Sequence, residues 1–306
     1  MKKTDLLFFD LIDDYQIIYL FAHEHPDFDA HNSQKALALY LQEHYPTKTV
    51  VVVKDDDTSV EPESLGIILD CSNASRVAGK NFHHCRTTFL IDHHVSSGDF
   101  TDYRLIDEKA VATAELLACL LMKKTAKLSS EVAQCLLNAI VGDSLNFSIP
   151  STTAQSLEIA ALLVDCGASI DLAQRKVFAC SFAEFRCLSA LRELVELKDG
   201  LLSLKVTKEF VEHYQVSIDF AKEGIKEFKN IAEAAIIALF YETEDGLFNC
   251  SLRSAEIEIN ALARKFGGGG HRLACGIKNL DEAAQQKLLI DLADLIQKQS
   301  STAKNL

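Results

Sequence analysis

The sequence predicts an α/β protein with two domains, and two observations lead to this prediction. In the first half of the 306-residue chain, short apolar runs rich in β-branched residues alternate with stretches of helical periodicity. Continuous apolar runs are typical of parallel strands that helices cover on both faces. A second α/β pattern begins near Gly200, after a long helical stretch. We therefore expect an N-terminal parallel-sheet domain in residues 1–190 and a smaller α/β domain in residues 200–306.

The expected N-terminal domain begins with strands and ends with helices. Its strands are predicted at residues 16–23, 48–54, 66–70 and 86–92, which are short and apolar. Helical periodicity over residues 33–44 predicts a helix between the first two strands. From Ala110 to about Lys198, segments rich in Ala and Leu predict a series of helices.

The expected C-terminal domain is a second, shorter alternation of strands and helices. Strands are predicted at residues 201–206 and 234–241, and residues 247–252 are expected to pair with the latter across the turn at 244–246. The glycine run 267–270 leads into a further short strand, and residues 280–297 are expected to form the last helix.

Composition limits the class of protein and of partner. The net charge of -13 argues against broad binding to long duplex nucleic acid, which needs many Lys and Arg contacts to phosphates. The acidic start does not resemble a signal sequence, and no apolar run approaches the roughly 20 residues that span a bilayer. The nine cysteines include no C-x-x-C pair, so neither disulfides nor a zinc knuckle is expected. We expect a cytoplasmic protein without membrane partners.

Ionisable residues gather where the predicted strands end. His23, Asp27 and Asp29 follow the first strand, Asp70 ends the third, and Asp92-His93-His94 ends the fourth. The carboxyl ends of parallel strands form one rim of the sheet, where ligands bind in open α/β folds. Taken singly, each residue has a structural explanation, such as a helix N-cap for Asp27 or Asp29. Their common placement at one rim favours a functional site.

The charge of this rim predicts a metal centre. Crowded carboxylates repel one another unless a positive charge lies between them, and a pair of divalent cations meets that need. Mixed imidazole and carboxylate ligands suit Mn²⁺, Fe²⁺, Co²⁺ or Zn²⁺ better than Ca²⁺, and we expect Mn²⁺. Two such ions lower the pKa of a shared water and stabilise the negative charge that develops on a phosphoryl group. Hydrolysis of a phosphate ester is therefore the expected reaction.

These residues resemble the motifs of the DHH phosphoesterase family, which is named for a triplet that appears here as Asp92-His93-His94. The segments 23–33, 69–73 and 142–147 are similar to three further motifs, the last of which contains Asp143. Residues 266–276, which include Gly268, Gly269, Gly270 and His271, resemble the mark of the associated DHHA1 substrate domain, with Arg253 in the preceding strand. The family arrangement implies an active site in the cleft between the two domains.

The resemblance implies a role for each matched residue. The metal ligands would be His23, Asp27, Asp29, Asp70, His93 and Asp143. Among them, Asp70 would bridge both ions; His94 would face the scissile phosphate, and Asp92 would orient His93. Arg253 and His271, with the glycine backbone at 268–270, would bind a phosphate of the substrate. The sequence departs from the family pattern at Phe28, where a glycine is usual, at residues 31–32, and at residues 71–72, all near the expected substrate edge.

The two-domain arrangement is similar to a branch of oligoribonucleases (nanoRNases) that also dephosphorylate 3'-phosphoadenosine 5'-phosphate. We expect hydrolysis of short oligoribonucleotides to mononucleotides, no action on long duplexes, and a homodimer. A cyclic-dinucleotide or linear-dinucleotide phosphodiesterase is the alternative enzyme, because it would use the same metal centre. A nucleotide-binding module without catalysis is the alternative outside enzymes, and the loss of a metal ligand would favour it.

Overall fold

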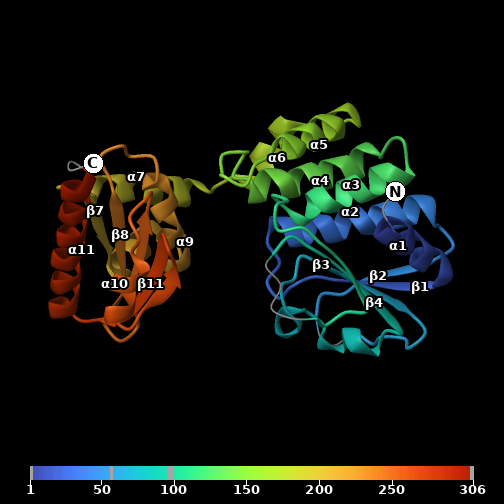
Figure 1. Ribbon diagram of the computed structural model, residues 1–306, viewed down its shortest axis with the longest axis horizontal. Coiled ribbons are helices and arrows are strands. Elements are labelled where there is room, and N and C mark those ends of the chain that lie inside the picture. The colour runs from blue at the N-terminus through green and yellow to red at the C-terminus, as the bar shows by residue number, and fades with distance from the viewer. Residues whose placement is uncertain (1–2, 56–57, 95–98, 304–306) are drawn as a thin grey trace. The chain divides into compact units, whose positions relative to one another are not determined.

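The structure is a computed structural model that describes residues 3–55, 58–94 and 99–303. It divides into two compact units, Met1–Ala179 and Cys180–Leu306 (Figure 1). Helix α7, Phe182–Glu193, therefore belongs to the second unit, although the sequence pattern attached it to the first domain. Each unit has its own hydrophobic cores.

The first unit contains a five-stranded sheet with the order β2-β1-β3-β4-β5, in which every neighbouring pair is parallel. The strands are β1 (Ile17–Phe21), β2 (Thr49–Val52), β3 (Leu65–Leu69), β4 (Thr87–Asp92) and β5 (Tyr103–Ile106). Four of them were predicted. β5 was not, because its four residues are exposed or half-buried and lack the apolar run that marks the buried strands.

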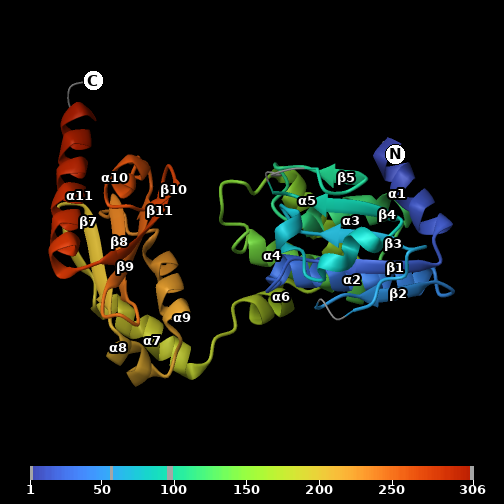
Figure 2. The same ribbon diagram turned by 90° about the horizontal axis from the view of Figure 1, so that it is seen from below.

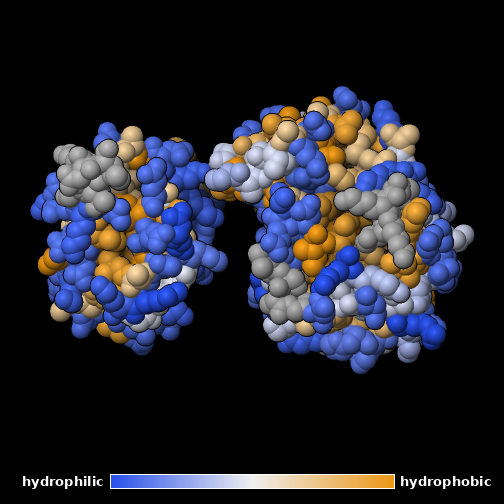
Figure 3. Space-filling model, viewed as in Figure 1, coloured by the Kyte–Doolittle hydropathy of each residue, from blue (hydrophilic) through white to orange (hydrophobic). Residues whose placement is uncertain are grey.

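Helices cover one face of this sheet (Figures 1 and 2). They are α1 (Lys3–Asp14), α2 (Phe28–His44), α3 (Thr113–Lys124), α4 (Ser130–Asp143), α5 (Ala154–Asp165) and α6 (Ile170–Val177). α2 and α3 pack on the strands, α4 packs on α2 and α3, and α5 and α6 pack on α4. Short 3-10 turns, η1 (Ala74–Arg76) and η2 (Lys80–His84), follow β3, and Phe82 of η2 joins a smaller core cluster with Phe21 and Leu90. Figure 3 shows hydrophobic residues at the surface over α5, and two leucines of this helix, Leu157 and Leu162, are exposed.

The second unit is built on a six-stranded mixed sheet with the order β10-β11-β9-β8-β7-β6, in which only β7 and β8 are parallel. The strands are β6 (Glu196–Lys198), β7 (Leu201–Val206), β8 (Ile236–Glu242), β9 (Phe248–Ser254), β10 (Gly269–His271) and β11 (Ala274–Leu280). The strand that follows the glycine run and the predicted pairing of β8 with β9 are confirmed.

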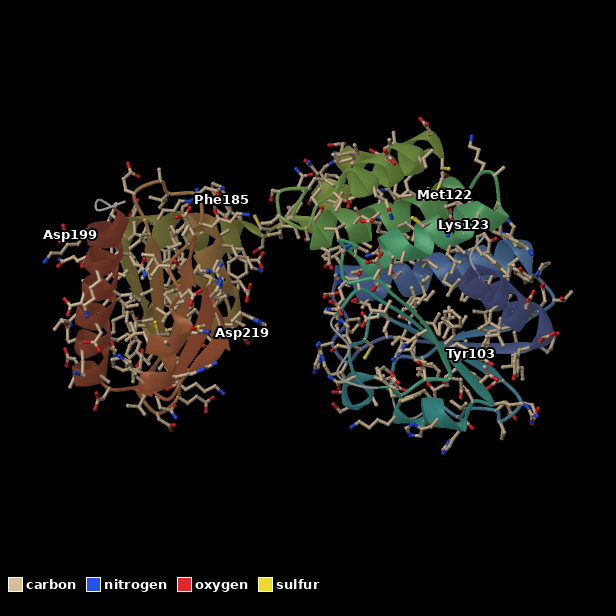
Figure 4. The ribbon with its side chains drawn as sticks, in the orientation of Figure 1. Tyr103, Met122, Lys123, Phe185, Asp199 and Asp219 are labelled. Carbon is tan, nitrogen blue, oxygen red and sulfur yellow. The ribbon has the colours of Figure 1, made fainter. Side chains whose placement is uncertain are left out.

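Two hydrophobic clusters, one on each face of this sheet, hold the helices of the second unit. One cluster contains Leu252 and Leu292 and involves α10 (Asn260–Lys265) and α11 (Glu282–Ala303). The other contains Leu191 and Leu202 and involves α7, α8 (Lys208–Tyr214), α9 (Ile218–Glu223) and the 3-10 turn η3 (Gly224–Phe228). Figure 4 labels Phe185 on α7 and Asp219 on α9. Among the described residues, no helix combines the length and the apolar character that crossing a bilayer requires.

Candidate active site

The first group of candidate ligands lies at the junction of β1 and α2. His23 follows β1 and is 6% exposed. Asp27 is the N-cap of α2, where its Oδ1 accepts a hydrogen bond from the backbone N–H of Ala30 at 3.0 Å. The cap explains why an aspartate suits this position even without a metal, and it fixes the carboxylate. The His23 Nε2 atom lies 3.7 Å from Asp27 Oδ1.

Asp29 is fully buried in the first turn of α2, and the start of α3 surrounds its carboxylate. The backbone N–H groups of Thr113 and Ala114 donate to its two oxygens at 2.6 Å and 3.0 Å, and the Ser33 hydroxyl donates at 3.0 Å. The N-terminus of a helix carries a partial positive charge that favours an anion. These donors orient Asp29 and offset part of the cost of its burial. The sequence analysis did not identify Thr113, although a threonine that opens an apolar helical run is a recognisable signal.

Asp70 directly follows β3 and adopts the left-handed backbone region, with φ 56°. Aspartate and asparagine tolerate this region better than other residues with a side chain. The Asp70 side chain is 1% exposed, and the Thr113 hydroxyl donates to its Oδ1 at 3.0 Å. One residue of α3 therefore holds two of the candidate ligands, Asp29 and Asp70.

His93 follows β4 with its ring fixed by a backbone carbonyl. Its Nδ1 donates a hydrogen bond to the Ala110 carbonyl oxygen at 3.2 Å, so Nε2 is the ring nitrogen that can coordinate a metal. Nε2 lies 3.3 Å from Asp143 Oδ2, 3.6 Å from Asp70 Oδ1 and 3.9 Å from Asp29 Oδ2. Ligand histidines commonly use the second ring nitrogen in this way.

The expectation that Asp92 orients the His93 ring needs correction. The Asp92 carboxylate accepts the backbone N–H of His93 at 2.9 Å, but its side-chain partner is His94, whose Nδ1 donates to Asp92 Oδ1 at 2.8 Å. The reason is local geometry, because successive residues point to opposite sides of an extended chain and Asp92 therefore shares a side with His94. This hydrogen bond engages Nδ1 of His94.

Asp143 ends α4 and is followed by a tight left-handed turn. Leu145, Asn146 and Phe147 have φ values of 45°, 59° and 61°. For residues with a Cβ, this conformation costs roughly 1–2 kcal/mol each. The Ser144 hydroxyl accepts the Phe147 N–H at 2.8 Å and helps to hold the turn. Strained backbone of this kind is common at functional sites, and the turn fixes the helix end that carries Asp143.

The six predicted ligands converge on one place, where they form two groups with Asp70 next to both. His23, Asp27 and Asp70 form one group whose ligand atoms lie within 4.8 Å of one another, and Asp29, His93 and Asp143 form another. Asp70 Oδ2 lies 3.7 Å from His23, while its Oδ1 lies 3.6 Å from His93. The two oxygens of one carboxylate thus face the two groups. A third combination, Asp70 with His93 and His94, is weaker because Asp92 occupies His94 Nδ1.

The electrostatics of the site fit a cation. Burial and the neighbouring Asp70 and Asp143 raise the pKa of Asp29 well above its usual value. Burial, followed by the charge of Asp27, raises the pKa of Asp70 to about 6. Burial opposes protonation of His93, but Asp143, Asp29 and Asp70 outweigh it and raise the pKa of that imidazole to about 9. The raised pKa values of the two aspartates and of His93 share one cause. Too much negative charge lies in this part of the protein, so each group binds a proton more tightly than usual. The donor set suits a divalent metal.

Two of the predicted substrate residues of the second unit, Arg253 and His271, lie in one row of its sheet. Arg253 of β9 pairs with Ala274 of β11, which pairs with His271 of β10. Directly opposed residues share a face, so Arg253 and His271 flank the small Ala274 at two strand spacings, about 10 Å. The Arg253 guanidinium donates a hydrogen bond to the Leu252 carbonyl oxygen at 2.9 Å. Lys229, which the sequence analysis did not single out, lines a cavity with Arg253.

The glycines of this hairpin differ in what they require. A side chain on Gly268 would collide with the Gly276 carbonyl, and one on Gly270, where φ is 135°, would collide with Ala274. The space beside Gly269 is open. Gly268 and Gly270 are therefore needed for the close approach of the hairpin strands, and a substrate role for all three glycines stays a prediction.

Comparisons with known proteins agree with these two units. Residues 17–140 match the DHH family, N-terminal domain, and residues 207–298 match the DHHA1 domain. The chain is 30% identical over 294 residues to the uncharacterized protein MG371 of Mycoplasma genitalium, with 90% of each chain covered. It is 28% identical over 312 residues to a Bacillus subtilis protein named bifunctional oligoribonuclease and PAP phosphatase NrnA, with 96% of this chain and 98% of that protein covered. A crystal structure of an exopolyphosphatase-related protein from Bacteroides fragilis has the same fold, with a TM-score of 0.79, 20% identity, and coverage of 97% and 98%.

Proposed function

This chain belongs to the DHH family and carries a DHHA1 domain, and from that premise we propose that it is a metal-dependent phosphodiesterase that hydrolyses short oligoribonucleotides to mononucleotides. We extend the proposal to removal of the 3'-phosphate from 3'-phosphoadenosine 5'-phosphate. The names of relatives that match nearly the whole chain support both activities. The observation that carries the proposal is the position of Asp70 between two groups of ligands.

The proposed cofactor is a pair of divalent cations, with Mn²⁺ as the preferred metal. His23 and Asp27 would hold one ion, Asp29, His93 and Asp143 would hold the other, and Asp70 would bridge them. Bound in this way, the ions would lower the pKa of a water molecule and stabilise charge on the phosphoryl group. The chain prepares the site for them, since Thr113 and Ala110 orient three of the ligands through hydrogen bonds.

His94 is proposed to face the scissile phosphate. Its hydrogen bond to Asp92 raises the pKa of the imidazole, which favours the protonated ring. The side chain is 42% exposed, so Nε2 is accessible to a substrate. In the reaction, a bond forms from water oxygen to phosphorus and the bond from phosphorus to the ribose 3'-oxygen breaks. A protonated His94 stabilises the negative charge of the phosphoryl oxygens while this happens.

The second unit is proposed to bind a phosphate of the substrate through Arg253 and His271. Arginine supplies a planar set of donors that suits phosphate, and His271 adds a second donor across Ala274. Nothing in this proposal depends on the homodimer or on the cytoplasmic location expected from the sequence, and both stay predictions.

The test is product analysis with purified protein and Mn²⁺. RNAs of 2 to 5 nucleotides, cyclic dinucleotides and 3'-phosphoadenosine 5'-phosphate are incubated in parallel and resolved by ion-exchange chromatography, with EDTA as the control. We expect mononucleotides from the short RNAs and adenosine 5'-phosphate from 3'-phosphoadenosine 5'-phosphate, with no reaction in EDTA. Turnover of cyclic dinucleotides alone would favour the alternative phosphodiesterase, and substrate binding without turnover would favour a binding module.

A further inference from the structure

A cavity of about 600 Å³ lies between α2 and the end of β2, beside the candidate metal centre. Figure 2 shows these two elements next to each other at the edge of the sheet. Its α2 wall consists of residues 31, 34, 35, 38, 39 and 42, which form one face of the helix. His23 belongs both to the cavity wall and to the first group of metal ligands. The cavity therefore adjoins the candidate metal site at His23.

The charge of the cavity is opposite to that of the protein. The chain has 44 acidic residues against 31 Lys and Arg, yet no Asp or Glu is among the described residues that line the cavity. Lys35, Lys54 and His31 line it and are exposed. Within the described part of the chain, neither lysine has an ion-pair partner, and Asp55, which follows Lys54, does not line the cavity. Such a local reversal of charge favours an anionic ligand.

The floor of the cavity is apolar and rigid. Ala38, Val53 and Ala78 contribute to it and are buried. Gln34 fixes α2 to the strands, because its side-chain amide donates to the carbonyl oxygens of Leu20 at 2.7 Å and Val53 at 3.2 Å. An apolar floor with a few charged groups at the rim is typical of small-ligand sites, and the volume lies in their usual range of about 300–1,000 Å³. A nucleoside that carries a phosphate combines these features.

We infer that this cavity binds the nucleoside that an oligoribonucleotide carries on the 3' side of its scissile phosphate, with Lys35 and Lys54 binding the next backbone phosphate. The inference rests on the proposed function. Hydrolysis of a short RNA and of 3'-phosphoadenosine 5'-phosphate releases a nucleoside 5'-phosphate in both cases. Arg253 and His271 are already proposed to bind a phosphate of the substrate. Only the RNA has a further nucleoside beyond the scissile phosphate, and the cavity next to His23 provides a place for it.

Two kinds of variant separate the charged rim from the apolar floor. Lys35→Glu reverses a charge at the rim, and Lys127→Glu is the matched control because Lys127 is exposed and lies just beyond the far end of α3. Ala38→Leu fills the floor without changing a charge. Each protein is assayed with Mn²⁺ on a dinucleotide, a trinucleotide and 3'-phosphoadenosine 5'-phosphate, and circular dichroism checks that it is folded.

Lys35→Glu is expected to lower kcat/KM for the trinucleotide, relative to that for 3'-phosphoadenosine 5'-phosphate, by about tenfold. The same ratio for the dinucleotide should change less, because a dinucleotide has no phosphate beyond its second nucleoside. Ala38→Leu should lower the ratio for both RNAs, and Lys127→Glu should lower neither. Equal losses on all three substrates, or unchanged ratios in both cavity variants, would show the inference to be wrong.

A binding measurement keeps this test independent of turnover. A fluorescently labelled trinucleotide is titrated into Asp70→Asn protein with and without Lys35→Glu, and anisotropy reports the Kd. We expect the added substitution to raise the Kd about tenfold. An unchanged Kd would contradict the inference, while wild-type turnover of the same RNA would still support the proposed function. Absence of wild-type turnover together with the expected change in Kd would contradict the proposed function alone.

Discussion

Replacing Asp70 with asparagine separates the catalytic role of this residue from its structural one. The substitution keeps the shape of the side chain and removes one negative charge. Asparagine also tolerates the left-handed backbone at this position, with φ 56°, whereas alanine would add roughly 1 kcal/mol of strain. We therefore expect Asp70→Asn protein to fold, to lose the bridging carboxylate and to lose hydrolysis.

The electrostatic magnitude follows from the burial of the carboxylate. The pKa of Asp70 is raised from 3.8 to about 6, chiefly by burial and then by Asp27. The folded, metal-free protein therefore holds this proton more tightly than the unfolded chain does. The resulting stability is present below about pH 4 and is lost as the pH rises toward 6. The shift of about two pKa units corresponds to about 3 kcal/mol. Above pH 6, replacing the charged carboxylate with a neutral amide should therefore increase the free energy of unfolding by up to about 3 kcal/mol.

The assay is thermal unfolding at pH 8, in EDTA and in Mn²⁺, together with turnover of 3'-phosphoadenosine 5'-phosphate. In EDTA, Asp70→Asn should raise the Tm by up to about 6–12 °C, since 1 kcal/mol shifts the Tm of a unit of this size by about 2–4 °C. Mn²⁺ should raise the Tm of the wild type and leave that of Asp70→Asn nearly unchanged. Asp165→Asn, at an exposed residue in the last turn of α5, is the matched control and should change little.

Two results would refute this reasoning. A metal-free Asp70→Asn protein less stable than the wild type at pH 8 would mean that the buried carboxylate stabilises the fold without a cation. Turnover near the wild-type level, with metal controlled, would mean that Asp70 does not bridge the ions.

Three further predictions follow from the same geometry. Thr113→Val removes the hydroxyl that donates to Asp70 and should weaken Mn²⁺ binding about tenfold in a calorimetric titration, whereas Thr113→Ser should restore it. Mn²⁺ affinity should fall as the pH is lowered from 9 to 5. The reason is that His93, with a pKa of about 9, and Asp70, with a pKa of about 6, must lose protons to bind the metal. An affinity that does not depend on pH would contradict these two ligands. Arg253→Ala should raise the KM for 3'-phosphoadenosine 5'-phosphate about tenfold and leave the Mn²⁺ affinity unchanged, and equal losses of both would count against a phosphate-binding role.

The sheet of the first unit was predictable because burial leaves a strong signature. Residues 66–70 and 86–92 are apolar without alternation, as strands covered on both faces must be, and their carboxyl ends place Asp70 and Asp92 at one rim. β5 and α1 were not predicted, because β5 is short and partly exposed and the acids in α1 interrupt its apolar pattern. β2 is as exposed as β5, but it was predicted because its run of valines is a strong β-branched signal.

The candidate ligands were predictable to different degrees. His23 and Asp70 follow strands, so their convergence can be argued from the sheet alone. Asp143 ends a helix, where acids are common, and only the family resemblance singled it out. The partner of His93, the Ala110 carbonyl, lies 17 residues away along the chain, and no local pattern indicates such a contact. The convergence of the candidate ligands could be predicted, but the hydrogen bonds that orient them could not.

The start of α3 explains how the chain folds around a charge surplus before any metal binds. Asp29 is fully buried, yet it accepts three hydrogen bonds at the positive end of a helix, so its burial is partly compensated. Among the described residues, the Asp70 carboxylate accepts one hydrogen bond, from the hydroxyl of Thr113. The uncompensated charge is therefore shared by Asp29, whose pKa is also raised well above its usual value, and Asp70, the carboxylate that faces both ligand groups. Because a cation at that point relieves a cost already present in the folded state, its binding free energy should appear as added stability as well as activity.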